Sequence, residues 1–483
     1  MKYVFLLVGL SLVLTSCGAD GIEPSSAPIN ESPSSDSPGD LETNFVANEE
    51  SNRNGYSEFC EYGTFDADWG ELYEWGRKTG FCIGPTAWVD AIPDDDFPSD
   101  WLGDQASLEI EKCKLLNFDP GPNSQDPTNR AFPLPHQVDQ YASFFPKPSG
   151  RLLIVGVSGT DSATSAGTPA TDYAPDGEFI EHWVNGMNDF GDDFEVHFSP
   201  TYFDLGESLK NYGISHSSSR EKRQVFADRV LARLDQELNF DQWDGVIVVT
   251  TPGTPRGVLE QAALPWKNKT VMTIPPKTYT TKFVPDFPMI MPTWVIHELG
   301  HVGSGLDDPN GSNYFQNRKD GDPTDLGMAG WGLQSTSLTD RLGWNKWITG
   351  FLRDEQVICA DPGKPGTFAI KASSVISQGE KIVVLPVSDS RVIVLESIRA
   401  TGINYKLQSE SEGLLVYEIN TQDQRREHGA RLILGPGREP ERDIPLIVPD
   451  APLKAGESVT FGDLTITVLE VADHADLVAI SSK

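Results

Sequence analysis

The sequence predicts an α/β (α+β) half-domain followed by an all-β C-terminal module of sandwich type. Between residues 149 and 260, buried-strand runs alternate with amphipathic helical segments, which is the pattern of an α/β fold. From residue 359 to residue 483, short β-branched runs are separated by turn residues, which is typical of a sandwich. We therefore expect one domain over 149–358 and a β-rich module over 359–483.

The composition restricts the functions open to this protein. Its 483 residues include 71 Asp or Glu and 38 Lys or Arg, which gives a net charge of −33. So acidic a chain is a poor candidate for holding nucleic acid phosphates or an anionic membrane by charge, and we expect no nucleic acid partner. An apolar share of about 45%, counted with glycine, excludes wholesale disorder.

The first residues have the form of an export signal. Residues 1–16 contain Lys2 and an apolar run too short to cross a bilayer as a mature helix. The segment 14–17 (LTSC) resembles the bacterial lipobox, in which the cysteine becomes a lipidated N-terminus. We therefore expect an exported lipoprotein of the bacterial envelope, at the outer membrane or cell surface, anchored through a lipid on Cys17. An ordinary secretory signal with a chance cysteine, and release from the cell, are the alternatives.

Residues 17–55 are expected to form a disordered tether between the lipid and the folded protein. Ser, Pro, Asn and acidic residues dominate this stretch, and Arg53 is its only strong base after residue 19. Such a composition cannot bury enough apolar surface to offset the entropy of ordering. The tether should be an extended, self-repelling spacer.

Four further cysteines, Cys60, Cys82, Cys113 and Cys359, fit an oxidising compartment. An even number in an exported chain suggests two disulfides, with three possible pairings. Because three of the four lie between residues 60 and 113, we expect one local bridge and one that reaches Cys359. A zinc site of four cysteines is the alternative, but no two of them have the Cys-x-x-Cys spacing.

Residues 56–148 are interpreted as a disulfide-bearing pre-domain, either a prosegment that is removed or a permanent subdomain. They are rich in Trp, Gly, Pro and Asp and show little periodicity. Strand and helix patterns alternate after them. The expected strands are 151–157, 194–198 and 246–250, and the expected helices are 178–190 and 220–234, with a loop over 158–176.

Seven β-branched runs define the expected C-terminal module. They lie at 381–387, 391–398, 413–419, 431–434, 458–461, 464–471 and 476–480.

The segment that carries chemistry is TWVIHELGH, residues 293–301. On a helix, His297 and His301 are four residues apart, so both imidazoles project from one face. That spacing suits two adjacent ligand positions on Zn²⁺. Glu298 lies one step round the helix, where it can act on a water molecule as general base without binding the metal.

The context separates this motif from two surface histidines on an ordinary helix, which is the alternative. Thr293 can cap the helix N-terminus. Val295, Leu299 and Val302 fall on the face opposite the histidines and would anchor the helix in the core. The chain also carries an export signal, and an α/β half-domain precedes the motif, as in zincin folds.

A catalytic zinc ion needs a third protein ligand, for which Asp307 and Asp308 are the candidates. Gly303 and Gly305 let the backbone leave the helix and return a carboxylate to the metal. Asp307 occupies the metzincin-type position. However, Ser304 stands where that pattern has glycine, and a shift by one residue gives the role to Asp308. Both assignments stay open.

Several segments follow the zinc motif in a recognisable order. The stretch 297–308 is followed by 322–328 (DPTDLGM) and 340–344 (DRLGW), and later by 394–396 and 413–420. In this order the sequence resembles the immune inhibitor A family of secreted bacterial metallopeptidases. The resemblance implies a zincin-like catalytic domain, one catalytic zinc ion and hydrolysis of peptide bonds.

The resemblance also implies a role for one methionine. Met328 would form the Met-turn, a hydrophobic floor beneath the zinc ligands. An ordinary core methionine is the alternative.

A calcium site is a second metal hypothesis. Asp320, Asp322 and Asp325 lie with other oxygen-bearing side chains in one Gly- and Pro-containing loop. Such a density of oxygen ligands suits a hard cation such as Ca²⁺. In a chain of this charge, a simple acidic surface loop is the alternative.

These observations predict a zinc-dependent endopeptidase acting on protein or peptide substrates at the bacterial surface or envelope. A catalytically silent binding or adhesion lipoprotein on the same scaffold is the first alternative. A metalloenzyme acting on a glycan or an ester is the second. An intact Glu298 favours the peptidase, because a binding protein needs no general base.

Overall fold

The structure is a computed structural model of the chain. The residues that it describes belong to one compact unit, Ala47–Lys483. They are 101, 106–115, 146–191, 193–255, 257–267, 269–275, 277–279, 287–289, 292–304, 327–328, 330–336, 339–404, 407, 411–421, 429–438 and 450–482. The expected signal peptide, Cys17, the tether, Cys60 and Cys82 lie outside the described residues.

The first half contains a six-stranded, mostly parallel sheet in the order β2-β1-β4-β6-β5, with β3 paired to the end of β1. Its strands are β1 (Arg151–Ser158), β2 (Glu195–Phe198), β3 (Phe203–Asp204), β4 (Gly245–Thr250), β5 (Ala262–Ala263) and β6 (Thr270–Thr273). Only the edge strand β5 runs antiparallel to its neighbour. A two-stranded sheet of β7 (Lys277–Tyr279) and β8 (Phe287–Met289) follows.

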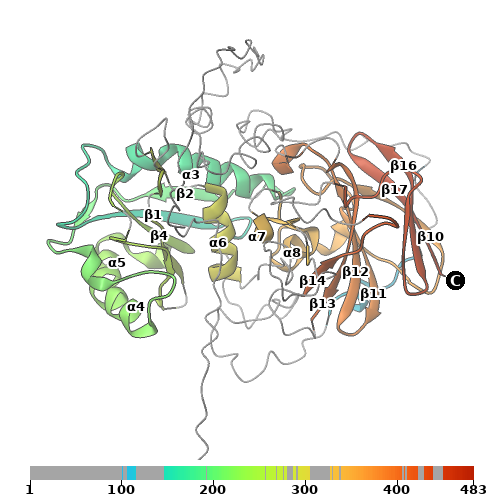
Figure 1. The fold of residues 1–483 in the computed structure, drawn as a ribbon, viewed down its shortest axis with the longest axis horizontal. Helices are drawn as coiled ribbons and strands as arrows, with labels where there is room; N and C mark the ends of the chain where they lie inside the picture. Colours follow the sequence, from blue (N-terminus) through green and yellow to red (C-terminus); the bar gives the residue numbers. More distant parts are fainter. Residues whose placement is uncertain are drawn as a thin grey trace, which may run out of the picture. The chain divides into compact units, whose positions relative to one another are not determined.

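Helices cover both faces of this sheet (Figure 1). One face packs against α3 (Pro169–Gly186) and α6 (Pro292–Ser304) in a single hydrophobic cluster. The opposite face packs against α4 (Arg220–Phe226), the π-helical turn η8 (Ala227–Leu231) and α5 (Ala232–Leu238). The predicted mixture of strands and helices in this half is confirmed.

The side-chain alternation along the central strands explains the two covered faces. Leu152 and Ile154 of β1 point toward α3 and α6, together with Ile247 of β4. Leu153 of β1 and Val246 of β4 point to the opposite face. Because a parallel sheet is buried on both sides, its strands are continuous apolar runs rather than alternating ones.

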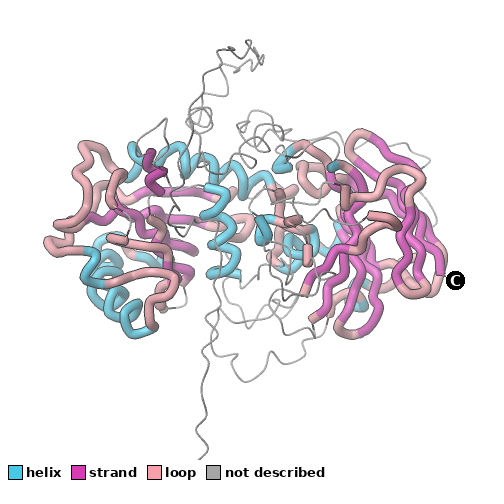
Figure 2. The backbone as a smooth tube through the Cα atoms, in the orientation of Figure 1, coloured by secondary structure: helices cyan, strands magenta, loops and turns pink. Residues whose placement is uncertain are grey.

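The second half begins with two short helices and continues with two sheets (Figure 2). The helices are α7 (Leu333–Thr336) and α8 (Gly343–Ile348). The five-stranded sheet has the order β14-β13-β12-β11-β9 and the four-stranded sheet the order β10-β17-β16-β15. Their strands are β9 (Val357–Cys359), β10 (Gly366–Lys371), β11 (Ile382–Ser388), β12 (Arg391–Ile398), β13 (Gly413–Asn420), β14 (Ala430–Leu432), β15 (Ser458–Phe461), β16 (Leu464–Ala472) and β17 (Ala475–Ser482).

The two C-terminal sheets share one hydrophobic core. Val383 and Leu395 of the five-stranded sheet pack with Phe368, Ile466 and Val478 of the four-stranded sheet. The four-stranded sheet is antiparallel throughout, whereas β9 joins the other sheet in parallel to β11. The prediction of a β-rich C-terminal module is confirmed, and its seven predicted runs all contain strands.

The prediction for the first helix was wrong in its bounds. Helix α3 begins at Pro169, inside the segment expected to be a loop, and ends at Gly186. Thr168 caps it, because its side chain accepts a hydrogen bond from the N–H of Thr171 while the Thr171 side chain caps Thr168 in return. This reciprocal cap and a proline at the first helical position fix the start of the helix.

One predicted disulfide partner is confirmed, since Cys113 is bonded to Cys359. Two residues shortly before Cys113 pair with the C-terminal module: Ser107 bridges Ala360, and the Leu108 N–H donates to the Cys359 carbonyl at 2.7 Å. The four-cysteine zinc site thereby loses two of its ligands to a disulfide.

Candidate metal centre

Helix α6 carries the motif histidines, and its apolar face is buried in the core. Val295, Ile296 and Leu299 have no exposed surface and pack with α3 and the first sheet. Val302, which the sequence placed on this face, is only partly buried, and Ile296 supplies apolar contact instead. The core thus fixes the rotation of the helix about its axis.

The two motif imidazoles converge. His297 Nε2 and His301 Nε2 are 2.9 Å apart, and the ring centroids are separated by 4.5 Å with the planes nearly perpendicular. His297 is buried, at 9% exposure, and His301 is partly exposed. The spacing predicted from the sequence therefore brings two ring nitrogens to one point.

A backbone carbonyl orients the first of these rings. His297 Nδ1 lies 2.8 Å from the carbonyl oxygen of Leu333 in α7. Since a carbonyl only accepts hydrogen bonds, Nδ1 donates to it, and Nε2 is left directed at His301. Sequence reasoning missed Leu333, because nothing in the spacing links it to a residue 36 positions earlier.

Glu298 lies between the two histidines in sequence, on the same helix. Its side chain is partly exposed, unlike those of Ile296 and Leu299 on the core side. Glu298 therefore lies outside the fully buried core face of the helix.

The described residues do not by themselves form a complete metal-binding set. Among them, no group of three or more His, Cys, Asp or Glu side chains could hold a metal ion. Both candidate third ligands, Asp307 and Asp308, lie outside the described part of the chain, as do the three residues of the calcium hypothesis, Asp320, Asp322 and Asp325. A third protein ligand beside His297 and His301 would have to come from residues beyond those described.

Met328 is fully buried at the start of a tight turn. Its carbonyl accepts a hydrogen bond from the Trp331 N–H at 2.9 Å, which closes the turn. The side chain packs in a cluster with Trp331, Leu342 and Trp344, whereas the apolar face of α6 belongs to a different cluster. The chain leaving this turn leads directly into α7 and the carbonyl that orients His297.

A buried ion pair lies beside α7. Asp340 and Lys346 are paired, and both side chains are almost completely shielded from solvent. The Leu333 N–H donates to the Asp340 carbonyl at 3.0 Å, and the Asp340 N–H donates to Asn404 Oδ1 at 2.7 Å. Burial raises the pKa of Asp340 although the ammonium group of Lys346 lies against it.

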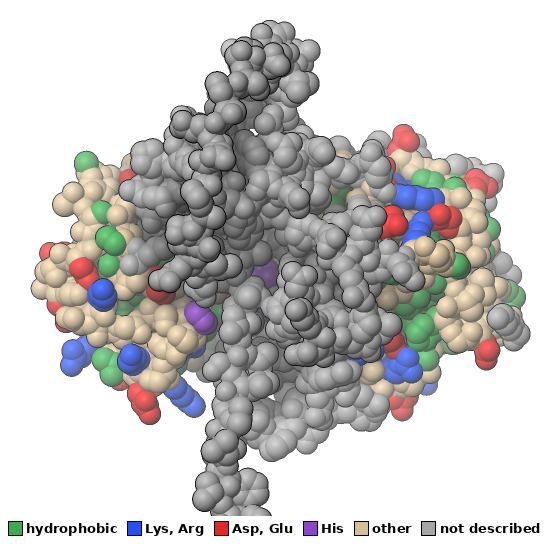
Figure 3. All heavy atoms as spheres, viewed as in Figure 1, with side chains coloured by type: hydrophobic (Ala, Val, Ile, Leu, Met, Phe, Trp, Pro, Cys, Tyr) green, Lys and Arg blue, Asp and Glu red, His purple; other side chains and the backbone are tan. Residues whose placement is uncertain are grey.

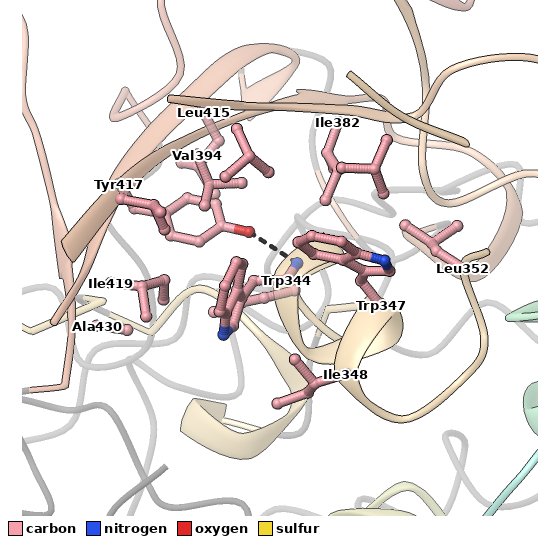
Figure 4. Packing of buried hydrophobic residues seen from close by; sticks show 14 of the residues in the cluster. Trp344, Trp347, Ile348, Leu352, Ile382, Val394, Leu415, Tyr417, Ile419 and Ala430 are labelled. Carbon is pink, nitrogen blue, oxygen red and sulfur yellow. Dashed lines mark hydrogen bonds between the residues drawn. The ribbon is translucent and has the colours of Figure 1, made fainter. Parts of the chain in front are cut away.

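Glu396 joins α8 to the five-stranded sheet. This buried carboxylate accepts hydrogen bonds from the Gly343 N–H at 2.8 Å and the Tyr417 hydroxyl at 3.1 Å. The Trp344 N–H donates to the same hydroxyl, as the dashed line in Figure 4 shows. Burial raises the pKa of Glu396. The segment 340–344 therefore acts as a structural junction.

One face of the described residues has mixed charge. On the face shown in Figure 3, their acidic and basic side chains are interspersed rather than gathered in one basic patch. Among the helices of the described residues, none is both long and apolar enough to cross a membrane.

No family model matches the sequence, and no curated protein matches it at a significant level.

Proposed function

We propose that this protein is a zinc-dependent endopeptidase with a zincin-like catalytic domain. The observation that carries the proposal is the 2.9 Å approach of His297 Nε2 to His301 Nε2 on a buried helix that also bears Glu298. Two imidazoles whose Nε2 atoms converge, with an adjacent partly exposed glutamate, form the core of a metal-assisted hydrolase.

The residues present fit a zinc ion. Nitrogens bound to one tetrahedral zinc at about 2.0–2.1 Å lie about 3.3 Å apart. The observed Nε2–Nε2 distance of 2.9 Å needs only a small adjustment. His297 also has the outer contact that zinc-binding histidines usually have, since Nδ1 donates to the Leu333 carbonyl. Asp307 or Asp308 would complete the ligand set.

The chemistry that zinc supplies in such a site is polarisation of a peptide carbonyl and activation of water. Glu298 accepts a proton from the attacking water and later gives it to the leaving amine. His297 and His301 hold their positions throughout, because the core beneath α6 and the Leu333 carbonyl fix the helix and the first ring.

The fold around α6 supports a zincin-like domain. A mostly parallel sheet with α3 on the same face precedes the motif helix in sequence, as the α/β half-domain of a zincin does. The helix packs directly on that sheet through Ile296 and Leu299. The Met328 turn leads from the chain after α6 to the carbonyl that orients His297.

The disulfide supports an exported protein. Cys113–Cys359 closes a separation of 246 residues, and such bonds persist in oxidising compartments. Together with the lipobox-like segment, it favours an envelope lipoprotein that is anchored through Cys17. Protein or peptide substrates would be met at that surface.

A peptidase assay on the purified chain tests the proposal. Wild-type protein should cleave casein or a quenched peptide, lose activity with 1,10-phenanthroline and recover it with Zn²⁺. Glu298→Gln should lower kcat/KM by at least about a hundredfold, because the general base is lost. Its zinc content, measured by elemental analysis, should stay at that of the wild type.

Three results would contradict the proposal. One is full activity of Glu298→Gln, and another is hydrolysis that persists in a zinc-free, chelated sample. The third is stoichiometric zinc without hydrolysis of any peptide by the wild type, which would favour the silent binding lipoprotein instead.

A further inference from the structure

A glutamine outside the motif contacts the backbone of the first motif histidine. Gln334 Nε2 donates a 2.7 Å hydrogen bond to the carbonyl oxygen of His297. The amide orientation is determined by this partner, since a flipped amide would place two oxygens against each other. Gln334 is 1% exposed, so the bond lies in the protein interior.

The same side chain lies flat against the glycine of the motif. A Cβ atom added to Gly300 would lie 2.4 Å from Gln334 Nε2 and 2.8 Å from its Cδ. Any larger residue at position 300 must therefore displace the glutamine. Because Gly300 has no side chain, the Gln334 amide occupies the space that a side chain at position 300 would take.

The polar atoms of Gln334 are not all satisfied. Its Oε1 is buried and has no hydrogen-bond partner among the described residues. A buried acceptor without a partner is unfavourable, and a methionine or leucine would fill the same space without that cost. The residue type at this position is therefore explained by the bond that Nε2 makes to His297.

Both contacts with His297 come from neighbouring residues of α7. Leu333 holds the imidazole through its carbonyl, and Gln334 holds the backbone carbonyl of His297. Two hydrogen bonds to the segment that follows α7 hold the start of this helix in place. The Leu333 N–H donates to the Asp340 carbonyl, and the Gly332 N–H donates to Thr339 Oγ1 at 2.8 Å.

We propose that Gln334 is a positioning residue for the metal site, which ties α7 to α6 so that the Leu333 carbonyl meets His297 Nδ1. The inference rests on the proposed zinc-binding function. Gly300 is its partner, because only a residue without a side chain leaves room for the glutamine amide. Loss of this tie lets α7 shift, which frees the imidazole and weakens metal binding.

The test measures zinc affinity against a competing chelator, with the full chain. Gln334→Met keeps the volume but loses the donor, and should weaken Zn²⁺ binding at least about tenfold, as loss of outer contacts to metal ligands generally does. Gln356→Met is the matched control. Gln356 is also a buried glutamine, but its Nε2 donates to Asp189 rather than to α6.

A second pair of variants tests the contact itself. Gly300→Ala should weaken zinc binding by displacing Gln334. In Gly300→Ala/Gln334→Ala the clash is absent. The loss of zinc affinity caused by Gly300→Ala should therefore be smaller in the Gln334→Ala variant than in the wild type. This comparison still tests the contact if Gln334→Met does not fold.

The outcomes separate this inference from the function on which it rests. A wild type that binds no zinc overturns both. A wild type that binds zinc, with Gln334→Met or the Gly300 pair unaltered in affinity, overturns only the inference. An equal loss of affinity in Gln356→Met also overturns it, because the effect would then be one of general stability. The d–d spectrum of the Co²⁺-loaded protein should change in Gln334→Met and not in Gln356→Met.

Discussion

Lys381 is a buried cation that connects two parts of the fold. Its Nζ donates to the carbonyls of Ala372 and Val375 and to Ser377 Oγ, and it lies 3.5 Å from Asp189, just beyond α3. Burial lowers the pKa of Lys381 to about 8, against the attraction of Asp189. The side chain thus exchanges hydration for carbonyl contacts and one carboxylate.

This shift predicts a pH-dependent contribution to stability. The unfolded lysine titrates near 10.5 and the folded one near 8, so between these values the unfolded chain holds a proton that the folded chain has released. Raising the pH through this window therefore favours the folded state. The free energy of unfolding of wild type minus that of Lys381→Met should rise by up to about 3 kcal/mol from pH 8 to pH 10.5.

Urea denaturation of both proteins at several pH values checks this. Below pH 8 the difference should be constant, because both states carry the proton. A difference that stays flat or falls between pH 8 and 10.5 would show that the lysine titrates normally in the folded chain.

At the scale of elements, capping determines helix α3 more than its apolar pattern does. The periodicity of Trp183 and Met187 indicates a helix but gives no information about its first turns. Those turns follow from the Thr168–Thr171 cap and from Pro169. Gly156 of β1 allows this start, since a Cβ there would lie 2.4 Å from Pro169 Cγ.

The cap gives a stability prediction. Thr168→Ala removes the oxygen that accepts the Thr171 N–H, and should lower the free energy of unfolding by about 1 kcal/mol. Thr168→Ser keeps that oxygen and should stay near the wild type. Equal stability of all three proteins in urea denaturation would mean that the cap contributes nothing.

Short strands show the limit of pattern reasoning. β9 has three residues, and β10 (Gly366–Lys371) has only Phe368 and Ile370 as large apolar residues, so neither gave a clear strand signal. Both are strands because neighbours provide their hydrogen bonds, β11 for β9 and β17 for β10. Longer runs such as β12 and β13 were predictable, because their apolar residues recur along the whole strand.

At the scale of the whole molecule, the described residues 101 and 106–115 of the pre-domain pack against the C-terminal module. Trp101 packs against Ala369 and Leu477, and its Nε1 donates to Glu470. The Cys113–Cys359 bond holds residues 106–115 at the edge strand β9. A prosegment cut between residues 116 and 145 would leave residues 101–115 attached through this bond.

The disulfide should be a main source of stability. Removing it with Cys113→Ala/Cys359→Ala should lower the free energy of unfolding by about 2–5 kcal/mol, since the unfolded chain regains the freedom of a long loop. Peptide mapping without reductant should find the two cysteines in one cross-linked peptide. Recovery of Cys113 as an alkylated free thiol would contradict the pairing.

The sequence by itself determined the local features of this protein. It predicted the β-branched strands and the helical spacing that brings His297 and His301 to one face, because these depend on residues close together in the chain. Only the tertiary structure placed Leu333 and Gln334 against His297, Lys381 beside Asp189, and Cys113 on Cys359. Such contacts join residues 36 to 246 positions apart, and no local periodicity carries information about which distant segments pack together.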